Sequence, residues 1–239
     1  MSEFQRVRAQ LPSMGPVTKW LCIAIVGVTL VATITQRSYG VGVSDLVFAV
    51  GPVLDLQLWR LVTFPFVELQ FFGLVLDLLV LYFFGRFFEA QWGSRHYLRF
   101  FFVSSVGAAV LAIPLSFLVD LVAPFNEIGM AAGPGAAIDA MLVALAVTVP
   151  NSNVMFGFIL PIRAKTLVLL VLGFQVIAGV MNGAAALSVT LGGMLMGYLL
   201  TTGMWRPERL GARLRSWLQR RRRRGLRVVD RPRRDETLH

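Results

Sequence analysis

The sequence predicts an all-α, polytopic membrane protein whose six transmembrane helices form one bundle. The 239 residues are 56% hydrophobic and only 15% charged, so the chain is more apolar and less charged than an ordinary soluble domain. A helix needs about 20 apolar residues to cross a hydrocarbon layer of about 30 Å. Six segments have this character, at residues 20–36, 70–87, 98–122, 132–149, 166–182 and 185–203.

The basic residues predict which side of the membrane each connection faces. Of the 23 Lys and Arg residues, 21 lie before the first predicted helix, around the second and fourth connections, or after the sixth helix. Only Arg37 and Arg60 lie on the opposite side. By the positive-inside rule both termini are cytoplasmic, and we expect a multi-pass protein of the cell (inner) membrane. Its partner is then the lipid bilayer and not nucleic acid.

The chain has three predicted parts. Residues 1–19 form a cytoplasmic N-terminal segment, residues 20–204 the membrane domain, and residues 205–239 a basic cytoplasmic tail. The tail can attract anionic lipid headgroups or serve only to hold the topology. Its unbroken basic run is Arg220, Arg221, Arg222, Arg223 and Arg224. The single cysteine, Cys22, lies in the first helix, so we expect no disulfide, no metal and no cofactor.

The only long connection, residues 37–70, is apolar rather than polar. We expect it to lie in the outer membrane interface as short amphipathic pieces. Trp59 would sit at headgroup depth, and Arg60 would reach toward phosphates or bond carbonyls within the loop. A simple interfacial anchor is the alternative interpretation.

The first connection and second helix carry a family resemblance. The segment Trp59–Asp77 reads W-R-L-V-T-F-P-F-V-E-L-Q-F-F-G-L-V-L-D, and Gly85, Glu89 and Trp92–Ser94 follow it. These residues resemble the first-loop and second-helix signature of the rhomboid superfamily. Leu160–Lys165 is similar to the short turn before the fifth helix of that family. The resemblance implies a six-helix rhomboid-like bundle.

Two glycine motifs extend the resemblance. Gly133 and Gly135 belong to a G-P-G-A sequence that falls where rhomboid proteases carry G-x-S-G. Gly193 and Gly197 form a G-x-x-x-G motif in the sixth helix, and two glycines one turn apart allow a neighbouring helix to approach closely. In rhomboids this groove packs the sixth helix against the fourth.

The catalytic residues of the family do not carry over. By the resemblance, the serine position is Gly135, the histidine position is Thr190, and the altered second-helix positions are Gly73 and Asp77. Neither of the two histidines in the sequence falls in a predicted membrane helix. A hydroxyl nucleophile needs a base to take its proton, so the resemblance implies a membrane domain without the catalytic dyad.

Two acidic residues lie in the middle of predicted helices. Asp77 and Asp139 are costly at membrane depth and therefore indicate a functional site. We expect them to line one polar pocket, with at least one carboxyl protonated at neutral pH, because no basic residue lies at that depth. The alternative is that each is protonated and hydrogen-bonded separately to a neighbouring group such as Gln175.

These observations favour a binding protein over an enzyme. The chain resembles rhomboid pseudoproteases such as Derlins, which implies that it binds transmembrane segments of client proteins without cleaving them, at a pocket that includes Gly133 and Gly135. One alternative is an intramembrane protease with a non-standard site, either serine-type or using Asp77 and Asp139. A small transporter is a third possibility, although the sequence lacks inverted repeats.

Overall fold

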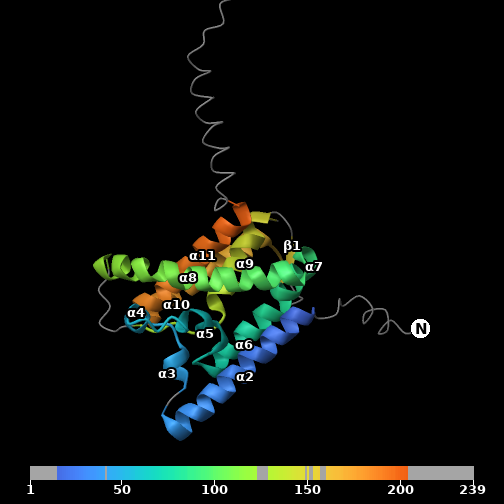
Figure 1. Cartoon of the computed structure of the whole chain (residues 1–239). Helices are drawn as coiled ribbons and strands as arrows, with labels where there is room; N and C mark the ends of the chain where they lie inside the picture. The colour runs from blue at the N-terminus through green and yellow to red at the C-terminus, as the bar shows by residue number, and fades with distance from the viewer. Residues whose placement is uncertain are drawn as a thin grey trace, which may run out of the picture. The chain divides into compact units, whose positions relative to one another are not determined.

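The computed structural model describes residues 15–40, 42–122, 129–148, 150, 153–156 and 160–203. The chain divides into two units, Met1–Thr202 and Gly203–His239, and only Gly203 of the second unit is described. The first unit is a helical bundle (Figure 1). The arginine run Arg220–Arg224 and most of residues 1–19 lie outside the described residues.

The longer helices of the first unit agree with the predicted membrane segments. In chain order they are α2 (Pro16–Tyr39), α6 (Phe71–Val80) continued by the π-helical turn η2 (Leu81–Gly85) and α7 (Arg86–Trp92), then α8 (Ser94–Val122), α9 (Gly135–Thr148), α10 (Ala164–Asn182) and α11 (Ala184–Thr202). Within the described residues, four helices are long and apolar enough to cross a membrane: α2, the span Phe71–Trp92, α8 and α11. The helices α9 and α10 are apolar but offer shorter stretches. The helical membrane fold is confirmed, and the count of six spans stays a prediction.

The long first connection folds into short helical pieces. These are α3 (Val43–Leu46), α4 (Val50–Leu54), α5 (Arg60–Thr63) and the 3-10 turn η1 (Phe64–Phe66). Phe48 and Phe64 are fully buried and pack with Ala108 of α8, while Phe48 forms a backbone bridge with Ala131. The connection is thus built partly into the protein core, because its aromatic side chains find partners on α8.

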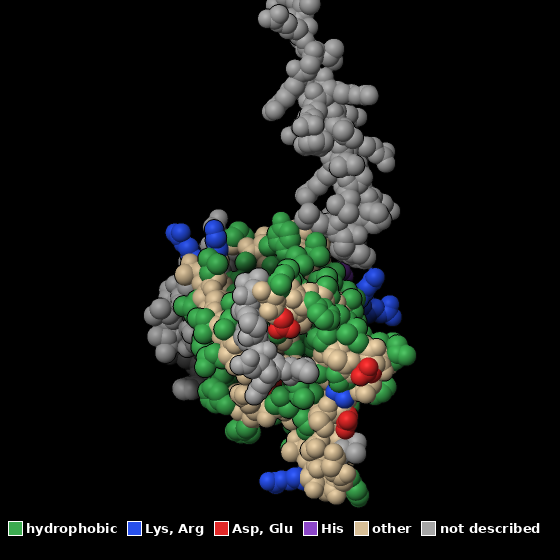
Figure 2. All heavy atoms as spheres, turned by 90° about the vertical axis from the view of Figure 1, so that its left-hand side faces the viewer, with side chains coloured by type: hydrophobic (Ala, Val, Ile, Leu, Met, Phe, Trp, Pro, Cys, Tyr) green, Lys and Arg blue, Asp and Glu red, His purple; other side chains and the backbone are tan. Residues whose placement is uncertain are grey.

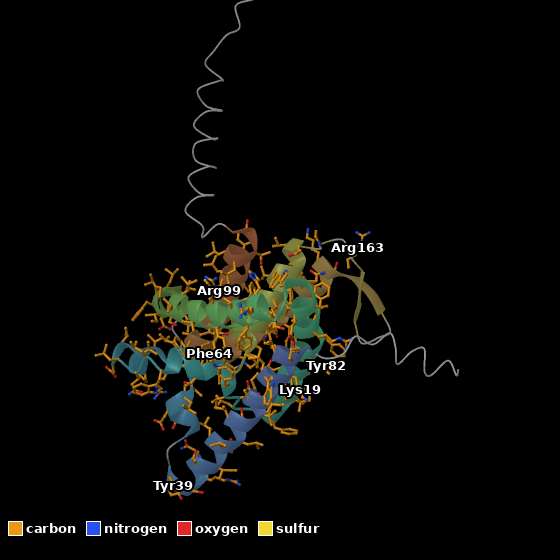
Figure 3. The ribbon with its side chains drawn as sticks, turned by 45° about the vertical axis from the view of Figure 1, so that its right-hand side comes forward. Lys19, Tyr39, Phe64, Tyr82, Arg99 and Arg163 are labelled. Carbon is orange, nitrogen blue, oxygen red and sulfur yellow. The ribbon has the colours of Figure 1, made fainter. Side chains whose placement is uncertain are left out.

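The connection between α9 and α10 contains a β-hairpin. Strand β1 (Asn153–Phe156) pairs antiparallel with β2 (Leu160–Arg163), with Asn153 opposite Arg163. The resemblance implied only a short turn at Leu160–Lys165. A two-stranded ladder satisfies backbone hydrogen bonds in a connection that is not helical, which explains why the chain pairs here before α10 begins. In Figure 3, Arg163 lies well away from Tyr39 at the far end of α2.

Small residues hold the centre of the bundle together. A Cβ atom at Gly193 would lie 2.6 Å from the carbonyl oxygen of Ala136, and one at Gly192 would lie 2.6 Å from that of Ala108. Gly197 approaches Ala140 in the same way. Helix α11 therefore packs backbone to backbone on α8 and α9, which fixes the face of α9 that carries the candidate site.

The buried carboxylate of Glu89 connects the beginning of α2, the end of α7 and the beginning of α8. Glu89 of α7 accepts hydrogen bonds from the backbone nitrogens of Val17 (3.0 Å) and Thr18 (2.9 Å) and from the hydroxyl groups of Thr18 (2.8 Å) and Ser94 (2.7 Å). A carboxylate is stabilised at a helix N-terminus, where backbone N–H groups lack partners within the helix. Glu89 thereby joins the start of α2 to the turn between α7 and α8.

Candidate functional site

A cavity of about 500 Å³ lies between α6, α10, α11 and the segment that precedes α9. Its lining includes five of the residues that the sequence singled out: Gly73, Asp77, Gly135, Gln175 and Thr190. Different helices form the walls of the cavity. Its shape therefore depends on how these helices pack, and the close packing of α11 on α9 is part of that arrangement. Hydrophobic side chains cover much of the face of the molecule shown in Figure 2, as expected of a protein surrounded by lipid.

The positions assigned to the rhomboid dyad meet in this cavity. Gly135, at the serine position, and Thr190, at the histidine position, both line it. A Cβ atom at Gly135 would meet no atom within 4 Å, so a side chain there would project into open space. His96 lies elsewhere, in the first turn of α8, with its ring against Trp92. Among the described residues that line the cavity there is no imidazole and no serine.

Asp139 lies behind the cavity wall. Its side chain is 1% exposed, and its Oδ1 atom accepts a hydrogen bond from Nε2 of Gln175 at 3.4 Å. It also interacts electrostatically with Asp77, which lines the cavity. Its Oδ2 atom has no hydrogen-bond partner among the described residues. Asp77 and Asp139 are therefore close enough to interact, but only Asp77 lines the cavity.

A third carboxyl, Glu68, belongs to the site and was not anticipated from the sequence. It lines the cavity together with Asp77, and the two carboxyls are close enough to interact electrostatically. Its Oε1 atom also accepts hydrogen bonds from the backbone nitrogens of Leu69 (2.9 Å) and Gln70 (3.2 Å). Burial raises the pKa of Glu68, and these hydrogen bonds oppose the rise. Its acidic side chain in a largely apolar connection was a weak signal, because Asp45 and Asp55 of the same connection share it.

Gly133 makes room for this carboxyl. Its φ angle of 85° lies in the left-handed region, and a Cβ atom there would collide with the Glu68 carboxyl. The backbone nitrogen of Gly133 donates hydrogen bonds to the carbonyl oxygens of Phe64 (3.0 Å) and Val67 (2.7 Å). These hydrogen bonds connect the segment before α9 to the end of the first connection, next to Glu68.

Arg60 has a different role from a phosphate contact. It is 5% exposed, and its Nη1 atom donates to the carbonyl oxygens of Ser44 (2.6 Å) and Val47 (3.0 Å). Because these groups surround the guanidinium, the expectation that it reaches toward lipid phosphates is wrong, and it bonds carbonyls within the connection. Trp59 is 53% exposed, and its Nε1 atom donates to the carbonyl oxygen of Asp45 at 3.2 Å.

Comparisons with known proteins agree with this architecture. The model of a family described as eukaryotic integral membrane protein (DUF1751) matches residues 19–201. Rhomboid-like protein 19 of Arabidopsis thaliana is 30% identical over 151 residues, which cover 59% of this chain and 47% of that protein. The chain therefore spans about half the length of this relative. It belongs to the DUF1751 family and is a rhomboid-like integral membrane protein.

Proposed function

We propose that this protein is a rhomboid-like pseudoprotease that binds transmembrane segments of client proteins without cleaving them. The observation that carries the proposal is the cavity of about 500 Å³ at the dyad positions, where Gly135 and Thr190 stand in place of a nucleophile and its base. A retained cavity without an activated nucleophile suits binding better than acyl transfer.

The arrangement of α6 and α10 suggests how a client reaches the cavity. Both helices line it; α10 packs chiefly on α9 and α11, whereas α6 has α9 as its packing partner and continues directly into η2. Each helix also exposes large apolar side chains, such as Phe72 and Leu76 of α6 and Phe174 and Ile177 of α10. A client helix can lie against these apolar surfaces and turn its polar residues toward the cavity.

The proposal includes the predicted topology, with several membrane spans and both termini in the cytoplasm. The alternation of basic residues supports it. The name of the matching family refers to eukaryotes, which favours a eukaryotic membrane over the expected inner membrane of a bacterium. Anionic lipid is proposed as a partner of the tail through its arginine run.

A hydrolytic site built from two carboxyls is the second candidate. The electrostatic interaction between Asp77 and Asp139 favours it. Two carboxyls that activate one water must both reach that water, and only Asp77 lines the cavity. This geometry makes binding the preferred function.

Site-specific photocrosslinking tests the proposal. A photoreactive amino acid at Gly135 projects into the cavity, and the same amino acid at Gly27 of α2, where a Cβ atom also meets nothing within 4 Å, is the matched control. Both proteins are reconstituted with a panel of single-span reporter proteins. We expect crosslinks to the reporter membrane segments from position 135 well above those from position 27, and intact reporters throughout. Equal crosslinking from both positions, or specific cleavage of a reporter, would overturn the proposal.

A further inference from the structure

The proposed binding cavity is acidic and has no internal counter-charge. Glu68 and Asp77 line it, and none of the described lining residues is a lysine or an arginine. The remaining hydrogen-bonding side chains of the lining are neutral, namely Gln70, Gln175, Asn182 and Thr190. Two neighbouring carboxyls resist ionising together, and an opposite charge close by favours their charged forms, so the cavity suits a cation.

The structure reserves space for the acidic pair. A Cβ atom at Gly73 would lie 3.1 Å from Oε1 of Glu68, and one at Gly133 would lie 3.1 Å from Oδ2 of Asp77 and would collide with the Glu68 carboxyl. Glycine at both positions, one of them with a positive φ, allows the carboxyls to sit at the cavity instead of being displaced from it.

A third carboxyl supplies an independent indication of a missing partner. Asp139 is 1% exposed, and its Oδ2 atom has no hydrogen-bond partner among the described residues. A buried acceptor without a donor is costly, so such an atom indicates a ligand or a proton. Both groups that interact with Asp139, Gln175 and Asp77, line the cavity, and its carboxyl therefore points toward the cavity wall.

Among the described residues, none that lines the cavity supplies a cation. Arg60, the basic residue of the first connection on which Glu68 lies, is bonded instead to Ser44, Val47 and Gln57, whose Oε1 atom lies 2.7 Å from its Nε. Asp77 lies six residues beyond the first residue of α6, which corresponds to about 9 Å along the helix axis. In the proposed topology this end of α6 faces away from the cytoplasm, so a cation carried by a client segment meets the carboxyls in the outer third of the bilayer.

On this basis, and resting on the proposed function, we propose that the preferred clients are transmembrane segments with a lysine or arginine in their outer third. The basic side chain enters the cavity and pairs with Glu68 and Asp77, while Asp139 lies behind Gln175 at the cavity wall. A lone basic residue is costly in a bilayer, so a client that carries one gains stability from this pairing. Apolar segments bind only through the exposed faces of α6 and α10.

Binding of designed peptides to the full-length protein tests the inference. The probes are leucine-alanine helices of about 20 residues that carry one lysine about six residues from the outer end, and matched peptides with methionine or glutamate at that place. Affinities are measured in nanodiscs of neutral phosphatidylcholine, so that anionic lipid does not attract the peptides. We expect the lysine peptide to bind at least about tenfold more tightly than the methionine peptide, which corresponds to about 1.4 kcal/mol.

Variants identify the carboxyls that are responsible. In the double variant Glu68→Gln/Asp77→Asn the ratio of lysine to methionine affinities should fall close to one, whereas Asp120→Asn, which removes an exposed carboxyl of α8, should keep the parent ratio. Equal affinities for lysine and methionine peptides in the parent, or equal binding of the glutamate peptide, would overturn the inference while leaving client binding intact. Failure of every peptide to bind would overturn the proposed function itself.

Discussion

Gln175 of α10 donates a hydrogen bond to Asp139 of α9, with 3.4 Å between Nε2 and Oδ1. This contact joins a residue that lines the cavity to a carboxyl buried behind it, and it is the hydrogen bond that the described residues offer to that carboxyl. The position of α10 is therefore linked to the hydrogen bonding of Asp139.

Loss of this hydrogen bond should destabilise the fold. Gln175→Leu leaves both oxygens of Asp139 without a donor, and we expect a loss of about 1–3 kcal/mol in the free energy of unfolding. Asp139→Asn replaces the buried ionisable group with a neutral amide, so this variant should fold at least as well as the parent. Denaturant unfolding in detergent measures both effects. If Gln175→Leu is as stable as the parent, the pairing contributes nothing.

Glu68 should give the protein a stability that depends on pH. Because burial raises its pKa above the ordinary value of 4.5, the folded state binds more protons than the unfolded state between the two values. The free energy of unfolding should therefore fall as the pH rises from about 4.5 through the raised pKa. Glu68→Gln should flatten this decline, and the exposed loop variant Asp55→Asn should not. An unchanged pH profile in Glu68→Gln would contradict this interpretation.

Glu89 should be the most sensitive polar residue of the bundle. It accepts four hydrogen bonds, from Val17, Thr18 and Ser94. Glu89→Ala removes them all, and since a single hydrogen bond to a charged group contributes about 1.5–3 kcal/mol, the loss should reach at least the upper end of that range. Thermal unfolding compares it with Ser94→Ala, which removes one donor. The same loss in both variants would show that the carboxylate does not join α2 to α7.

The close contact of Gly193 in α11 with Ala136 in α9 should also contribute to the stability of the bundle. Gly193→Val places a side chain against the Ala136 carbonyl, and such overpacking should cost about 1–3 kcal/mol. Gly27→Val, at a glycine with open space around it, controls for the change in helix propensity. Comparable stability of the two variants would mean that the helices adjust without strain.

Much of this architecture follows from local sequence. The apolar segments predicted the long helices because membrane-crossing length is a property of one continuous stretch. The order of motifs likewise indicated that Gly135 and Thr190 fall together, although they are 55 residues apart, and both line the cavity. Here a family resemblance supplied the long-range information that periodicity cannot give.

The remainder depends on contacts that leave no pattern in the sequence. Glu68 joins the site only because the first connection folds back onto the segment before α9, where Gly133 donates to Phe64 and Val67. Arg60 is enclosed by carbonyl groups, and a carbonyl is present at every residue whatever its side chain. The strands before α10 are four residues each, too short for alternation to distinguish them from a turn.

The central claim is that the vacated site binds client segments and does not cut them, and blocking the cavity tests it most directly. Gly135→Leu fills open space instead of displacing a neighbour, so the fold should remain intact, with Gly27→Leu as the matched control. In proteoliposomes that contain a lysine-bearing single-span reporter, the parent and the control should bind the reporter and leave it uncut, and Gly135→Leu should bind at least about tenfold more weakly. Cleavage of the reporter by the parent, or undiminished binding by a folded Gly135→Leu protein, would contradict the account.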